Sequence, residues 1–175
     1  MLKRILLILS LLTACALHGM AQENAVQELL SSFPEGRCLR AGYELTVTAR
    51  GNAGVTYRGT LWWQDGLFRI EGEGYSIYCD GEHVWTVDTE AGEIVRERAA
   101  GIDELVPSAG TGESETEIVR SSDGKRISSI SMKMKNGASV LIVVQSMVFT
   151  APEPVESFTF DGKPVPGDFV FTVLD

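Results

Sequence analysis

The residues of this chain that could perform chemistry are few and widely spaced. Beyond residue 21 the sequence contains one histidine, His83, with no serine or cysteine at a spacing typical of nucleophilic catalysis. Glu71 and Glu73 could resemble a pair of catalytic carboxylates, but Gly72 and Gly74 flank them, which is more typical of an exposed strand edge. We therefore expect His83 to face solvent from a strand, and we expect no enzymatic activity.

Metal ions, cofactors and nucleic acids are not expected ligands either. Histidines and cysteines are too few for a metal-binding cluster, and the glycines do not form a phosphate-binding loop ahead of a helix. The 175-residue chain has 15 Lys and Arg residues against 24 Asp and Glu residues, a net charge of −9. Nucleic-acid binding requires clustered Lys and Arg, so a nucleic-acid partner is disfavoured.

The first residues predict export. Lys3 and Arg4 precede an apolar run at 5–12, which is shorter than the roughly 20 residues that span a bilayer. Small residues before and at Ala21 suit cleavage by a signal peptidase. We therefore expect a signal peptide at residues 1–21 and a single periplasmic domain at 22–175.

Each of the three cysteines leaves two interpretations open. Leu12-Thr13-Ala14-Cys15 resembles a lipobox, in which Cys15 would be lipidated and become the mature N-terminus. Cleavage after Ala21 is favoured over lipidation of Cys15, because the mature chain then begins with a polar segment. An exported compartment permits a disulfide between Cys38 and Cys79, but the sequence cannot supply the Cα separation that it requires. Two buried strand thiols are the favoured alternative.

The elements that position these residues are mostly strands. Alternation of apolar and polar residues predicts strands at 43–50, 55–63, 67–71, 75–79, 84–88, 93–98, 118–119 and 127–135. A continuous apolar run at 139–149 predicts a strand in the middle of a sheet. Before them, Asn24–Phe33 has the apolar spacing of an amphipathic helix, and residues 102–106 could form one helical turn.

This order of elements predicts a mainly β (α+β) fold. About nine to eleven strands in one antiparallel meander make a sheet that curls as its twist accumulates. Two helical pieces cannot cover both faces of such a sheet. We expect a strongly curved sheet, an incomplete β-barrel, with the N-terminal helix and a short helical lid on its concave face.

The stretch Tyr75–Asp88 carries the most specific pattern. Asp80-Gly81 favours a two-residue type I′ turn between two strands rich in Tyr, Trp and Val. An aromatic strand, Asp-Gly, Trp85 and an acidic turn resemble the signature hairpin of LolA-type outer-membrane lipoprotein carriers. The preceding strand at 67–71 is similar to theirs, and a weaker similarity continues through Phe158-Thr159-Phe160 and Pro166-Gly167-Asp168.

The resemblance implies a lipid site between helix and sheet. It also implies two partners, an inner-membrane ABC lipoprotein-releasing complex and an outer-membrane acceptor, and we expect a monomer. The chain departs from the family at two positions, where Gln64 replaces an arginine and Ile70 a tryptophan. That arginine is thought to help latch the lid, which puts latching in doubt here.

Apolar residues on the alternating strands could form a dry core or line a cavity. The scarcity of helical segments, the adaptable Met132/Met134 pair and the resemblance favour a cavity. Phe68 and Ile70 share a face, so Arg69 should point outward to water. The expected lining residues are Leu29, Phe33, Leu45, Val47, Tyr57, Leu61, Trp63, Phe68, Ile70, Tyr75, Ile77, Ile130, Met132 and Met134.

Taken together, these patterns predict a non-enzymatic periplasmic carrier. Its expected role is to bind the acyl chains of lipoproteins and deliver them towards the outer membrane. The alternative is a lipid- or lipoprotein-sensing module on the same fold, anchored through Cys15. The mass of the mature N-terminus distinguishes a soluble shuttle from a tethered receptor.

Overall fold

The structure is a computed structural model. It describes residues 33–49, 53–99, 115–122, 126–134, 137–161, 163–165 and 167–174. The expected signal peptide, the body of the predicted N-terminal helix and the predicted helical turn at 102–106 lie outside these residues. Within the described part of the chain, no helix has the length and apolar character needed to cross a membrane.

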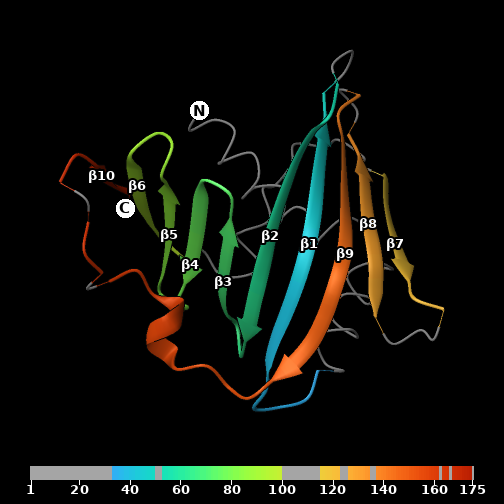
Figure 1. Ribbon diagram of the computed structural model, residues 1–175, viewed down its shortest axis with the longest axis horizontal. Helices are drawn as coiled ribbons and strands as arrows, with labels where there is room; N and C mark the ends of the chain where they lie inside the picture. The colour runs from blue at the N-terminus through green and yellow to red at the C-terminus, as the bar shows by residue number, and fades with distance from the viewer. Residues whose placement is uncertain are drawn as a thin grey trace.

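In the described part of the chain, ten strands form a single open sheet, which confirms the predicted mainly β, curved architecture (Figure 1). The elements are β1 (Cys38–Thr48), β2 (Val55–Gln64), β3 (Leu67–Gly72), β4 (Tyr75–Cys79), β5 (His83–Asp88), β6 (Glu93–Arg98), β7 (Glu115–Arg120), β8 (Ile127–Lys133), β9 (Ser139–Thr150), the 3₁₀ helix η1 (Val155–Phe158) and β10 (Val170–Leu174). The edges β7 and β10 lie at opposite sides of the sheet and do not meet.

The prediction of one continuous meander is wrong. The strand order is β10-β6-β5-β4-β3-β2-β1-β9-β8-β7, so only β1 to β6 and β7 to β9 pair in sequence. β9 pairs with β1, and β10 runs parallel to β6. Parallel neighbours need a crossover connection, and here the connection from β6 to β10 includes β7, β8, β9 and η1. Alternation of apolar and polar residues identifies each strand but not the strand with which it pairs, which is why the predicted meander was wrong.

The type I′ turn lies two hairpins earlier than predicted, between β2 and β3 instead of β4 and β5. Asp65 and Gly66 have positive φ angles of 51° and 86° and connect the paired ends of β2 and β3, as a type I′ turn requires. At Asp80-Gly81 only the glycine has positive φ, and four residues separate the last paired positions of β4 and β5. Asp80 instead accepts hydrogen bonds at Oδ1 from the amides of the two residues after Gly81, at 2.9 and 2.8 Å.

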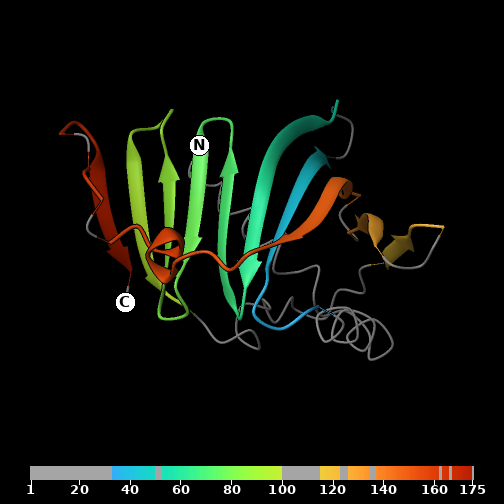
Figure 2. The same ribbon diagram turned by 60° about the horizontal axis from the view of Figure 1, so that its bottom comes forward.

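The larger hydrophobic core covers the face of the sheet that we call the inner face. Its buried members are Tyr43, Leu45, Ile70, Tyr75, Ile77, Cys79, Val84, Met132, Val140 and Ile142. The opposite, outer face carries a smaller buried cluster of Tyr78, Trp85, Val87 and Ile94, against which Phe160 and Phe169 pack. The outer cluster is therefore covered by the C-terminal segment, which crosses the sheet in Figure 2.

Two glycines on neighbouring strands make room for a tyrosine pair on the inner face. Gly59 and Gly72 lie opposite each other in the β2–β3 ladder, between Tyr43 of β1 and Tyr75 of β4. The two phenol oxygens meet above the glycines at 2.7 Å. A Cβ at Gly72 would overlap the Tyr75 ring, and a Cβ at Gly59 would lie 2.7 Å from the Tyr43 hydroxyl. The pair thus links strands that are not adjacent.

A row of cationic and aromatic side chains crosses the outer face. The ladders place its members opposite one another on six successive strands: Arg40, Trp62, Arg69, Tyr78, Trp85 and Arg96. The Arg69 guanidinium lies 4.2 Å from the centre of the Trp62 ring, in cation–π geometry. Arg69 does point away from the inner face, but the expectation that it reaches water is wrong. Its side chain is only 17% exposed, because it lies beneath the C-terminal segment.

Gln64 attaches this C-terminal segment to the end of β2. Its side chain is 7% exposed. It donates from Nε2 to the carbonyl of Glu153 at 3.3 Å and accepts at Oε1 from the Glu153 amide at 2.8 Å. Gln64 therefore holds the C-terminal segment through a pair of hydrogen bonds to the backbone of one residue, Glu153.

Removing this attachment should loosen the segment. We expect Gln64→Ala to lower the free energy of unfolding by about 1–3 kcal/mol, because the partly buried backbone N–H and C=O groups of Glu153 lose their partner. Hydrogen exchange at the Glu153 amide should accelerate, whereas Gln145→Ala, at an exposed glutamine, should change neither quantity. Unchanged exchange at Glu153 in Gln64→Ala would show that the segment is held by other contacts.

Candidate functional site: an apolar cavity on the inner face

An apolar cavity of about 220 Å³ lies on the inner face. The side chains that line it come from the region before β1 and from β1, β2, β3, β8 and β9: Phe33, Leu39, Ala41, Tyr43, Leu61, Trp63, Ile70, Ile127, Ile130, Ile142, Val144 and Met147. All except Tyr43 are hydrocarbon, indole or thioether groups. The described lining therefore offers dispersion contacts and few groups that could orient a polar ligand.

An irregularity in β9 brings two of these residues to the same face. The pairing of β9 with β1 joins Gly42 to Ser146 and Tyr43 to Val144, so it passes over Gln145. In a regular strand Val144 and Met147 would point to opposite faces, because side chains alternate. The extra residue shifts the alternation, and both residues line the cavity. This is the effect of a β-bulge.

Aromatic rings border one end of the cavity. Phe33 lies between Trp63 and Phe149, with ring centres 5.5 and 5.3 Å apart in edge-to-face arrangements. The β1 ladders place Trp63 and Phe149 on either side of Leu39. Phe33 therefore packs over the start of β1, at the point where the chain enters the sheet.

The cavity contains no reactive group among its described lining residues. Tyr43 is the one hydroxyl-bearing side chain in that set, and its oxygen is turned towards the Tyr75 hydroxyl at 2.7 Å. Burial, together with the neighbouring Tyr75, raises the pKa of Tyr43 well above that of an ordinary phenol. The phenol stays neutral, and it supports the strands without serving as an acid or base at neutral pH.

Five of the residues expected to line a cavity do so: Phe33, Leu61, Trp63, Ile70 and Ile130. Leu45, Tyr75, Ile77 and Met132 are instead buried in the core, and Val47, Tyr57, Phe68 and Met134 are partly buried against it. Leu29 lies outside the described residues. The inner face thus has a closely packed region around β4 and a cavity over β1, β2 and β9. Alternation alone does not distinguish the two regions.

The remaining lining residues were not identified from the sequence. Leu39 and Ala41 continue the alternation of β1 towards its start, so a longer strand would have included them. Ile142, Val144 and Met147 belong to a continuous apolar run, in which alternation gives no signal. The position of the bulge that orients Val144 and Met147 has no evident signature in the sequence.

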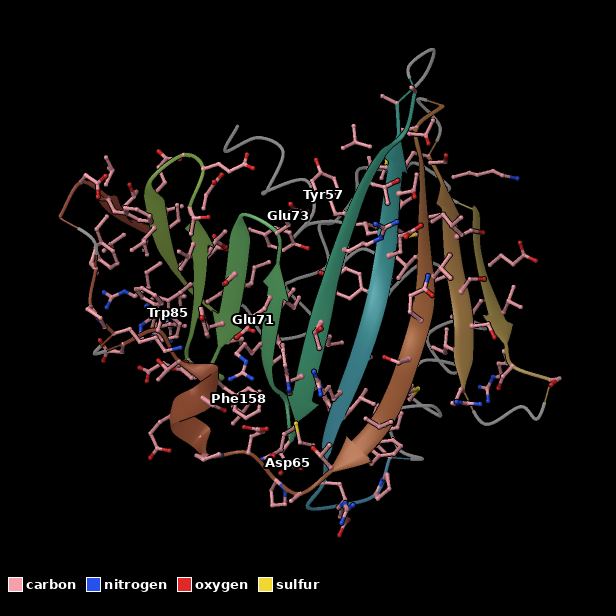
Figure 3. All side chains as sticks on the ribbon, viewed as in Figure 1. Tyr57, Asp65, Glu71, Glu73, Trp85 and Phe158 are labelled. Atoms are coloured by element: carbon pink, nitrogen blue, oxygen red, sulfur yellow. The ribbon has the colours of Figure 1, made fainter. Side chains whose placement is uncertain are left out.

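The acidic pair and the histidine lie at separate places on the sheet. Glu71 and Glu73 are both exposed, and Glu73 lies in the turn after β3 rather than on the strand. Figure 3 shows them at different positions along β3 and its turn. His83 is half-buried at the start of β5, 5.4 Å from the Trp85 ring. Within the described ranges, no three His, Cys, Asp or Glu residues are grouped so that they could hold a metal ion.

The two described cysteines are free and buried. Cys79 belongs to the inner core, whereas Cys38 precedes the inward-facing Leu39 and so lies on the outer side. Their placement on opposite faces excludes the bridge that the sequence left open. Burial raises the thiol pKa values of both cysteines above the usual value, so both thiols remain protonated and unreactive at neutral pH.

The fold and site define an open, curved and mostly antiparallel sheet with an apolar cavity on its inner face. No protein-family model matches the chain, and no curated protein matches it either. Among solved structures, the chain is similar to a LolA superfamily protein from Nitrosomonas europaea, with a TM-score of 0.49 and 13% sequence identity. The match covers 77% of this chain and 97% of that protein. These values do not establish membership of that superfamily.

Proposed function

We propose that the protein is a non-enzymatic carrier that binds acyl chains in the cavity on its inner face. The observation that carries the proposal is the apolar lining of this cavity, in which the hydroxyl of Tyr43 is engaged by Tyr75. Exposing an acyl chain to water costs about 0.8 kcal/mol per CH₂ group. A lining without polar anchors suits a ligand whose affinity comes from hydrocarbon burial.

The cavity's size favours partial insertion of a chain. Its volume of about 220 Å³ is below the roughly 300–1,000 Å³ of typical small-molecule pockets. A long acyl chain would therefore require the cavity to widen. Moving Phe33 out from between Trp63 and Phe149 would extend the apolar surface along Leu39. Each edge-to-face contact contributes about 0.5–1.5 kcal/mol beyond the area that it buries, so the entering chain would have to replace these contacts.

The finer part of the proposal concerns cargo and location. We infer that the acyl chains belong to lipoproteins, carried through the periplasm from an inner-membrane ABC releasing complex to an outer-membrane acceptor. The supporting features are the predicted signal peptide at residues 1–21 and the resemblance of the Tyr75–Asp88 hairpin to that of lipoprotein carriers. A soluble shuttle requires cleavage after Ala21.

Filling the cavity should abolish binding without harming the fold. Ala41 is 8% exposed and lines the cavity, so Ala41→Phe should place its ring in the space an acyl chain would occupy. We expect the affinity for a fluorescent fatty-acyl probe to fall at least about tenfold, or about 1.4 kcal/mol. The melting temperature should hold or rise, because the ring enters a space that is already present.

The matched control is Ala49→Phe, at an exposed alanine just beyond the end of β1. It adds the same ring beyond the opposite end of the same strand, outside the cavity, so probe binding should equal that of the unmodified protein. Equal binding by Ala41→Phe and Ala49→Phe would contradict the assignment of the site. A wild-type protein that takes up no acyl probe would contradict the proposed function itself.

A further inference from the structure

A second pocket, of about 240 Å³, lies on the outer face at the β10 edge of the sheet. Its lining consists of Glu82, His83, Arg96, Arg98, Val173 and Leu174. The ladders place His83 opposite Arg98, and Arg96 between Trp85 and Val173. Arg96 and Arg98 are two residues apart on β6, so their side chains project from the same face.

The cationic groups of this pocket lack partners in the described structure. Arg96 Nε is enclosed by protein atoms and makes no hydrogen bond. The ion pairs found among the described residues are Arg58 with Glu44 and Arg69 with Glu71, so neither Arg96 nor Arg98 is neutralised there. Glu82 also lines the pocket, but it is exposed and forms no ion pair with either arginine. A bound anion would give the two guanidinium groups that line the pocket a partner of opposite charge.

We propose that this pocket binds a phosphate-bearing group. Two guanidinium groups and an imidazole, converging in a chain of net charge −9, match the three acceptor oxygens of a phosphate. Arginine also suits phosphate in particular, since its planar fork forms paired hydrogen bonds. The volume exceeds that of the anion alone, and Val173 and Leu174 add apolar contacts. The ligand is therefore a phosphate ester with an apolar part, on the face opposite the acyl cavity and independent of it.

Phosphate binding can be tested with inorganic phosphate as the probe. Calorimetric titration at low ionic strength should show binding by the full chain, weakened at least about tenfold, or about 1.4 kcal/mol, by Arg96→Gln. Arg98→Gln should weaken binding similarly, so the test does not depend on one variant. Arg58→Gln removes an exposed arginine that is already bonded to Glu44 at 2.8 Å and should leave the affinity unchanged. Circular dichroism verifies the fold of each variant.

A second titration distinguishes a lipid headgroup from a soluble phosphate ester as the source of the phosphate. Vesicles of phosphatidylglycerol that bind the protein, and are displaced by free phosphate, identify a lipid headgroup as the ligand. Phosphate binding without vesicle binding identifies a soluble phosphate ester. The proposal is overturned if neither probe binds, or if Arg96→Gln and Arg98→Gln bind phosphate as well as the unmodified chain. Acyl-probe uptake by these variants should be normal, which separates this test from that of the inner cavity.

Discussion

Gly72→Ala is expected to destabilise the protein by about 3 kcal/mol. Overpacking a well-packed site costs about 1–3 kcal/mol, and the added methyl group would overlap the Tyr75 ring. Moving the ring away would also break the 2.7 Å hydrogen bond between Tyr75 and Tyr43, worth about 1 kcal/mol. Urea unfolding measures the loss directly.

Two controls make this result specific. Gly167→Ala, at a glycine with open space around it and no positive φ, should change stability by less than about 0.5 kcal/mol. In a Tyr75→Leu background the ring is absent, so Gly72→Ala should lower the free energy of unfolding much less. The difference between the losses in the two backgrounds is the coupling free energy of residues 72 and 75. A Gly72→Ala protein as stable as the unmodified chain would show that the tyrosine pair does not lie over the glycines.

Phe158→Ala should have an effect at least as large. Phe158 is fully buried, and η1 contacts β3, at the end of the sheet where Figure 3 also places Asp65. Truncating a buried phenylalanine costs about 3–5 kcal/mol. Calorimetric or urea unfolding should show this loss, and limited proteolysis should detect release of the C-terminal segment.

Val155→Ala is the matched control for that substitution. Val155 belongs to the same 3₁₀ helix but is 57% exposed, so its truncation should change stability by less than about 0.5 kcal/mol. Acyl-probe binding by the folded fraction of Phe158→Ala should persist, since the cavity lies on the other face. A stability loss below about 1 kcal/mol for Phe158→Ala would mean that the segment is not packed on the sheet as described.

Strands were predictable because their signal is local. Alternation located β2 to β6 and β8 closely, and the apolar run at 139–149 correctly indicated an interior strand. The pairing of β9 with β1 was not predictable, because it joins segments separated by most of the chain. The parallel pairing of β10 with β6 has the same origin. Packing in the folded protein determines which distant strands pair. An alternation of apolar and polar residues does not identify the partner strand.

The two Asp-Gly turns also show that local sequence does not fully determine structure. Asp65-Gly66 and Asp80-Gly81 share one dipeptide, yet only the first forms the type I′ turn. At the second, the Asp80 carboxylate holds a longer loop by accepting two backbone amides. Aspartate suits both geometries, so the dipeptide indicates a turn without fixing its length.

The candidate site was predictable in kind but only partly in detail. Which face is apolar follows from alternation, and Leu61, Trp63 and Ile70 were located in this way. Which apolar residues border empty space depends on how side chains of different sizes meet. The glycine pair makes room for the Tyr43 and Tyr75 rings, and the bulge in β9 turns Val144 and Met147 to one face. Both are features of the assembled sheet.

The most direct test of the central claim is mass spectrometry of lipids that co-purify with the protein from its own cells. The acyl-chain proposal predicts that the unmodified chain and Ala49→Phe carry molecules with acyl chains, and that Ala41→Phe carries none. Ala41 lines the cavity and Ala49 does not, so the two variants differ in the property under test. Equal amounts of bound lipid on both variants, or none on the unmodified protein, would contradict the proposal.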